Sequence, residues 1–68
     1  MKNMKIKVEN NLDEIVATLE SKGYRPHSKF YGDEICILTQ TDGLYCGDST
    51  GRFNNGYALT TLAELKEM

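Results

Sequence analysis

NLDEIVATLESKGY, residues 11–24, carries the clearest structural signal in this chain of 68 residues. Its aliphatic side chains recur at the i, i+3, i+4 and i+7 positions of one helix face, and they are Leu12, Ile15, Val16 and Leu19. Asn11 and Glu14 have the spacing of a capping box, and Gly23, Tyr24 and Pro26 indicate where the helix stops. We expect an amphipathic helix bracketed by Asn11 and Gly23.

The residues before this helix have the pattern of a half-buried strand. Met4, Ile6 and Val8 alternate with Lys5 and Lys7, which is the period-two pattern of a strand with one apolar face. We therefore predict a first strand over residues 4–8 whose outer face carries lysines.

A hairpin is predicted downstream of the helix. Two apolar runs, residues 34–39 and 44–47, are separated by Gln40-Thr41-Asp42-Gly43, and an Asp-Gly pair between apolar runs is a strong hairpin signal. Residues 25–33 are irregular, which predicts a loop or edge with the alternative of a short strand over 29–31. Turn clusters at 47–51 and 54–56 leave short extended pieces at 52–53 and 57–59.

The C-terminus predicts a second, short helix. Thr61 and Glu64 repeat the capping-box spacing, and Leu62 and Leu65 offer a small apolar face. The fold expected for residues 1–68 is a single compact α+β domain. It has a small antiparallel sheet of three to four strands, one main helix packed on one face, and a short C-terminal helix that is stable only when docked.

Composition and charge disfavour several classes of protein. With 40% hydrophobic and 26% charged residues, the chain has the balance of an ordinary globular protein. A net charge of -2 disfavours nucleic acid and anionic membranes as partners. The longest apolar run, residues 35–38, is far short of the roughly 20 residues of a membrane span, and the N-terminus is too polar for a signal peptide. We expect a cytoplasmic protein with no membrane contact.

Cys36 and Cys46 lie on either side of the Asp42-Gly43 turn. If two residues form the turn, the cysteines project from opposite faces; if the loop has three residues with a glycine bulge, they share a face. Free, packed thiols are favoured over a disulfide because a cytosolic compartment keeps thiols reduced. Metal ligation is the least favoured alternative, since a zinc site would need two further ligands.

Two stretches offer cationic side chains for a ligand. One is the alternating series at residues 25–31, whose members are Arg25, His27, Lys29 and Tyr31, and it could hold a phosphate or stack a base. The other is the glycine-rich turn 47–51 followed by Arg52, whose amides could cradle an anion. The favoured alternatives are a solvated loop face with Tyr31 covering the sheet edge for the first and a plain connection between strands for the second.

No catalytic residue, metal site or cofactor is predicted. The acidic residues Asp33, Glu34, Asp42 and Asp48 could in principle form a carboxylate pair, but turns account for Asp42 and Asp48. The only histidine, His27, has no acid or nucleophile near it in the sequence, so a dyad with either cysteine would depend on the fold.

An apolar interaction surface is the preferred site. One helix can cover only one face of the sheet, and Leu38 and Tyr45 are placed on the opposite face, with Tyr57 as a further member. Such a surface suits a protein partner or a second copy of the chain in a dimer.

The order of these signals resembles that of small accessory proteins of tailed bacteriophages. The shared features are the lysine-bearing strand over 4–8, the helix ending in Gly23-Tyr24, the hairpin, the Gly47-Asp48 turn and the terminal stretch 61–65. Arg25-Pro26 departs from the pattern, because an aromatic residue is expected soon after Gly23-Tyr24. The resemblance spans most of the chain and implies an accessory protein that acts in the cytoplasm of an infected bacterium. It transfers no catalytic role.

The predicted function is therefore a non-enzymatic interaction module that binds and modulates a host protein, with an anti-phage defence protein as one such target. The alternative is a homo-oligomer that sequesters a small ligand such as a nucleotide, using Arg25, Lys29 or Arg52 with a stacked tyrosine.

Overall fold

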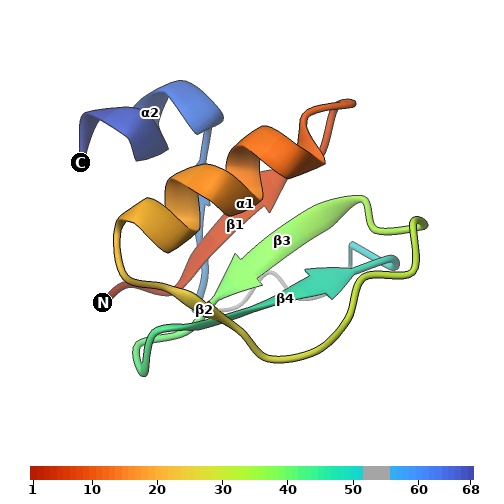
Figure 1. Ribbon diagram of the computed structural model, residues 1–68, viewed down its shortest axis with the longest axis horizontal. Helices are drawn as coiled ribbons and strands as arrows, with labels where there is room; N and C mark the ends of the chain where they lie inside the picture. Colours follow the sequence, from red (N-terminus) through yellow and green to blue (C-terminus); the bar gives the residue numbers. More distant parts are fainter. Residues whose placement is uncertain (52–55) are drawn as a thin grey trace.

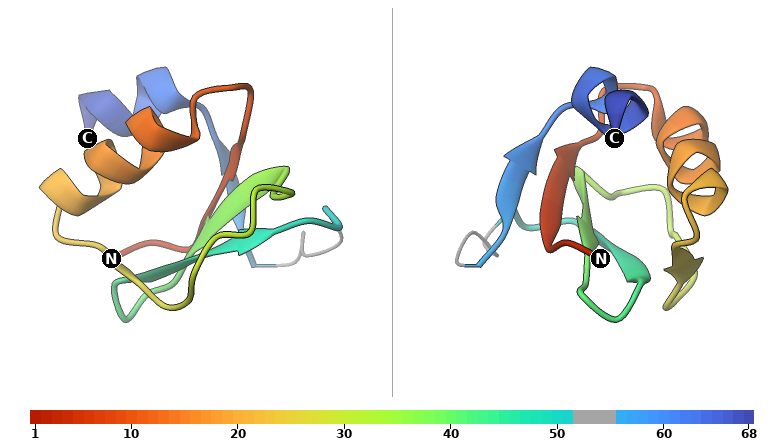
Figure 2. Two further views of the ribbon diagram at one scale, coloured as in Figure 1. Left: turned by 45° about the vertical axis from the view of Figure 1, so that its right-hand side comes forward. Right: turned by 90° about the vertical axis from the view of Figure 1, so that its left-hand side faces the viewer.

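The computed structural model describes residues 1–51 and 56–68 and has an α+β architecture (Figure 1). In chain order the elements are β1 (Met4–Lys7), α1 (Leu12–Ser21), β2 (Arg25–Pro26), β3 (Cys36–Thr39), β4 (Leu44–Asp48), β5 (Ala58–Thr60) and α2 (Leu62–Glu67). The strands form one five-stranded sheet in the order β2-β4-β3-β1-β5. Both helices lie on the same side of this curved sheet (Figure 2). The predicted α+β class is confirmed.

The sheet is mixed, so the prediction of an antiparallel sheet with three to four strands is wrong. β1, β3 and β4 pair antiparallel, but β5 runs parallel to β1 and β2 runs parallel to β4. Each parallel pair joins strands that are far apart in the sequence, because a tight turn can connect only antiparallel neighbours. The possible strand at 29–31 does not form, and the extended piece predicted at 52–53 lies outside the described residues.

The core lies between α1 and the sheet. Ile15 and Leu19 are buried, while Leu12 and Val16 pack half-buried against the cluster, as the helix pattern predicted. The buried residues of this hydrophobic core are Met4, Ile6, Ile15, Leu19, Tyr24, Ile37, Tyr45 and Leu65. Leu65 brings α2 into this core, which provides the docking that so short a helix needs.

The C-terminal end of α1 forms as predicted. Gly23 has a φ of 93°, the left-handed conformation that glycine adopts without a steric penalty. The amide of Tyr24 donates to the carbonyl of Leu19, and the amide of Gly23 donates to that of Glu20, both at 3.1 Å. This is a Schellman motif, and it turns Tyr24 back into the core.

The two predicted capping boxes have different outcomes. At α2, the Thr61 hydroxyl accepts from the Glu64 amide and the Glu64 carboxylate accepts from the Thr61 amide, each at 3.1 Å. At α1, the Asn11 side chain accepts at 2.7 Å from the amide of Glu9 and makes no capping bond. The expected box at Asn11 is wrong, because Asn10 has a φ of 60° and makes a turn that presents Glu9 to Asn11.

The β3–β4 hairpin has the longer of the two possible loops. The Gln40 amide donates to the Leu44 carbonyl at 2.8 Å, which leaves residues 41–43 as the loop, and Gly43 has a φ of 90°. Leu38 is opposite Cys46 in the resulting register, so both cysteines share a face. Cys36 and Cys46 are diagonal neighbours and both are free thiols.

Among the described residues, no helix has the length and apolar character needed to cross a membrane.

Candidate functional site

Tyr45 lies on the helix side of the sheet and is only 1% exposed, which corrects its predicted place on an open apolar surface. Its ring stacks on Phe30 with the centroids 6.0 Å apart, and its hydroxyl donates to the Glu20 carboxylate at 2.7 Å. The three-residue hairpin loop explains the error, because it sets the register that turns Tyr45 inward and Cys46 outward.

Leu38 does lie on the face without a helix, but it is only 4% exposed. It sits on the central strand β3, between Lys5 on β1 and Cys46 on β4. Tyr57 is half-buried, and its hydroxyl accepts a 2.7 Å hydrogen bond from the Gln40 side chain. The predicted interaction surface of Leu38, Tyr45 and Tyr57 is therefore wrong as a set.

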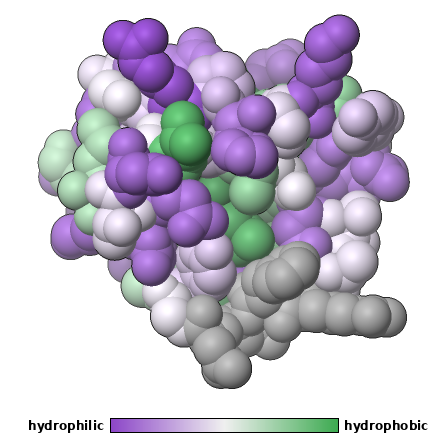
Figure 3. All heavy atoms as spheres, turned by 90° about the horizontal axis from the view of Figure 1, so that it is seen from below, coloured by the Kyte–Doolittle hydropathy of each residue, from purple (hydrophilic) through white to green (hydrophobic). Residues whose placement is uncertain are grey.

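The exposed apolar side chains on the helix-free side are instead Leu59, which is 80% exposed, and Ile35, which is 49% exposed. Together they border a hollow of about 240 Å³ whose lining residues are Lys5, Lys7, Ile35, Cys36, Gly51 and Leu59. We call this region the Leu59 face. Figure 3 views the molecule from the side away from the helices, where apolar atoms collect between polar ones.

The charged groups of the Leu59 face are lysines. Lys5 and Lys7 project from β1 on the same side as Leu59, since Lys5 pairs with Leu59 in the parallel register. The Lys5 ammonium donates to the Gly51 carbonyl at 3.0 Å, and the exposed Lys7 ammonium lies 3.5 Å from the Glu9 carboxylate. The hollow is thus an apolar depression bordered by positive charge.

Cys36 lines the same hollow as a neutral thiol. Its Sγ donates to Asp48 Oδ2 at 3.3 Å. Burial, followed by this hydrogen bond and the Asp48 charge, raises the pKa of Cys36 to about 11. Burial also raises the pKa of Cys46. Neither thiol is activated as a nucleophile, because the reactive thiolate is suppressed at neutral pH.

The glycine-rich turn after β4 is organised by Asp48. The carboxylate accepts from the Thr50 amide and hydroxyl at 3.0 and 2.8 Å and from the Gly51 amide at 2.9 Å. Burial acts to raise the pKa of Asp48, but the hydrogen bonds from Thr50, Cys36 and Gly51 outweigh it and lower the pKa. The Thr50 and Gly51 amides therefore donate to the Asp48 carboxylate, and not to a bound anion as one sequence-based hypothesis had it.

The basic series is exposed but does not converge on one site. Arg25 borders a hollow with Glu20 and Tyr24, whereas His27 borders a different one with Gln40 and Asp42. Lys29 and Tyr31 are exposed in the connection between β2 and β3, and Arg52 lies outside the described residues. The described members of the series therefore fit the solvated face that the sequence favoured, but Tyr31 is 85% exposed and is not packed over the sheet edge as expected.

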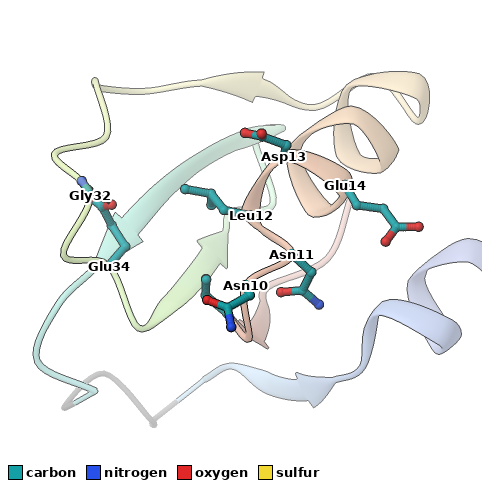
Figure 4. A pocket seen from close by; sticks show the side chains of 8 residues that line it. Asn10, Asn11, Leu12, Asp13, Glu14, Gly32 and Glu34 are labelled. Carbon is teal, nitrogen blue, oxygen red and sulfur yellow. Dashed lines mark hydrogen bonds between the residues drawn. The ribbon is translucent and has the colours of Figure 1, made fainter.

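A larger hollow of about 570 Å³ lies at the N-terminal end of α1 (Figure 4). Its carboxylates are Asp13, Glu14 and Glu34, and the Glu14 side chain points away from Glu34 in Figure 4. Glu34 accepts from the amides of Tyr31 and Gly32, and the Tyr31 bond is the main cause that lowers the pKa of Glu34. The carboxylates repel an anion, while the helix dipole opposes a cation.

The described residues contain no group of three or more histidine, cysteine, aspartate or glutamate side chains placed to hold a metal ion.

Comparisons with protein-family models, with curated proteins and with solved structures found no match to this chain.

The Leu59 face was not identified from the sequence. The alternation at residues 4–8 did place Lys5 and Lys7 on an outer strand face, and residues 57–59 were expected to be extended. The missing information was that β5 pairs with β1, which brings Leu59 beside these lysines.

Proposed function

We propose that this protein is a small non-enzymatic interaction module that binds another protein through the Leu59 face. The observation that carries the proposal is the 80% exposure of Leu59 beside an apolar hollow. Contiguous exposed apolar surface is typical of sites where proteins bind one another. The phage resemblance makes a bacterial host protein in the cytoplasm the proposed partner, with modulation of that protein as the outcome.

Two observations support binding over catalysis. Burial raises the pKa of both described thiols, which disfavours the thiolate form that would act as a nucleophile. The carboxylates of Asp48 and Glu34 are bonded to nearby backbone amides and serve the local chain conformation. The roles that these carboxylates have in the structure are to hold the turns in which they lie.

Affinity capture with matched variants tests this function. The immobilised wild-type protein, the double variant Leu59→Ser/Ile35→Ser and the control Tyr31→Ser are each exposed to bacterial lysate. Tyr31 is a suitable control because it is an exposed side chain, at 85%, that does not line the hollow. We expect a captured protein that the wild type and the control retain and the double variant loses. Identical captured proteins on all three would argue against the Leu59 face as the binding site.

A further inference from the structure

Strand β5 is a short edge strand that, among the described residues, has neither a proline nor a charged side chain. It lies at one end of the sheet order, and its residues are Ala58, Leu59 and Thr60. Edge strands are commonly protected by proline, by charged side chains or by a covering element. At the opposite edge, β2 contains Pro26. β5 contains neither proline nor charge, and its central side chain is 80% exposed.

The backbone N–H and C=O groups of Leu59 are directed away from β1, toward the open edge of the sheet. In a parallel ladder, alternate residues of an edge strand direct their N–H and C=O groups to the neighbouring strand. The Ala58 amide donates to the Asn3 carbonyl at 3.0 Å, and Leu59 pairs with Lys5 in the register. The N–H and C=O of Leu59 are therefore directed outward, away from β1.

The charge next to this edge favours an acidic partner. The Lys7 side chain is 80% exposed, and among the described residues its ammonium pairs only with the Glu9 carboxylate, at 3.5 Å. An exposed pair of this kind is weak, so a carboxylate from a partner can compete for Lys7. The positive charge of Lys5 on the same face acts in the same direction.

We propose that an extended, acidic segment of a partner protein adds to the free edge of β5 as a further strand. Its backbone pairs with the outward N–H and C=O of Leu59, one apolar side chain packs on Leu59 toward the hollow, and a neighbouring carboxylate pairs with Lys7. The proposal rests on the proposed function and specifies how the partner is bound.

A second copy of this chain fits the same edge less well. Residues 56–60 contain no carboxylate, so pairing of β5 with the β5 of another copy would bring no negative charge to Lys7. The negative charge is therefore assigned to a different protein. Self-association through β5 would appear in light scattering as a dimer of the wild-type protein.

The test uses a displayed library of random linear peptides selected on the wild-type protein. We expect the selected peptides to alternate apolar with acidic residues. Binding of one such synthetic peptide is then measured with Leu59→Pro, which removes an outward N–H that the sheet does not use, and with Leu59→Val, which keeps it. Leu59→Pro should weaken binding about tenfold or more, whereas Leu59→Val should change it only slightly.

The charge contribution has its own matched pair. Lys7→Glu should weaken binding of the acidic peptide about tenfold, while Lys29→Glu, with the same change in net charge on an exposed loop residue, should leave it nearly unchanged.

If Leu59→Pro does not fold, N-methyl-leucine introduced at position 59 by chemical synthesis removes the same N–H and retains the side chain.

The outcomes separate this inference from the proposed function. Undiminished binding by Leu59→Pro, together with loss in Leu59→Ser/Ile35→Ser, overturns strand addition and leaves the Leu59 face as a binding surface. Failure to recover any peptide whose binding depends on Leu59 also overturns it. A wild-type dimer in light scattering that Leu59→Pro converts to a monomer assigns the edge to a second copy and contradicts the acidic partner.

Discussion

The hydroxyl of Tyr45 donates a 2.7 Å hydrogen bond to the carboxylate of Glu20, and so connects β4 to the last turn of α1. Burial, and then the bond to Glu20, raises the pKa of Tyr45 to about 12. The phenol therefore remains a donor throughout the neutral range, and this polar contact joins the helix to the sheet at the edge of the core.

Replacing Tyr45 by phenylalanine removes this bond and keeps the ring stacked on Phe30. We expect Tyr45→Phe to lower the free energy of unfolding by about 1 kcal/mol, the usual net value of one hydrogen bond. Tyr45→Ala should cost about 3 to 5 kcal/mol because it also leaves a cavity. Urea denaturation measures both values. Tyr31→Phe, at an exposed tyrosine, is the control, and equal effects of Tyr45→Phe and Tyr31→Phe would show that the Glu20 bond contributes nothing.

Asp48 should make the stability of the protein depend on pH under acidic conditions. Its folded-state pKa is lowered, so the ionised carboxylate stabilises the folded state above the ordinary aspartate pKa of about 4, and this contribution is lost as the pH falls through the folded pKa. Asp48→Asn presents an amide nitrogen in place of one acceptor oxygen and should cost about 2 kcal/mol at pH 7. In urea denaturation at a series of pH values, the variant should lose less stability below pH 4 than the wild type. Parallel pH profiles for the two proteins would contradict the role of Asp48.

The Cys36 thiol should be unreactive in the folded protein. Its pKa of about 11 leaves almost no thiolate at pH 8, and the side chain is buried. In the variant Cys46→Ser, which retains Cys36, iodoacetamide should modify the thiol slowly until urea unfolds the chain. Modification at the same rate with and without urea, followed by mass spectrometry, would show that Cys36 is accessible.

The two helix starts should respond differently to alanine. Thr61→Ala removes a side-chain cap and should cost about 1 kcal/mol. Asn11→Ala removes only the exposed bond to the Glu9 amide and should cost about half of that or less. Thermal unfolding of both variants measures the difference. A larger loss for Asn11→Ala would indicate that Asn11 caps α1 in solution.

The local elements were predictable because each is specified by residues close together in the chain. The aliphatic spacing of residues 12–19 predicted α1, and Gly23 predicted its end. The cap at Asn11 could not be predicted in the same way, since Asn10 adopts a left-handed conformation that makes Glu9 compete with Glu14 for the same side chain.

The candidate site was less predictable because it depends on pairing between distant residues. Tyr45 faces the helix with a three-residue hairpin loop and would face the other side with a two-residue loop. The Asp42-Gly43 pair is compatible with both loop lengths. Leu59 lies beside Lys5 only because β5 crosses to the far edge of the sheet and pairs parallel with β1. No local pattern encodes that crossing.

Amide chemical-shift mapping of the labelled protein with a selected peptide locates the binding surface residue by residue. The proposal predicts that the largest changes occur at Lys5, Lys7, Ile35 and Leu59, and that amides of the hollow at Asp13 and Glu14 stay unchanged. Changes confined to Asp13 and Glu14, with Leu59 unaffected by a bound peptide, would contradict binding through the Leu59 face.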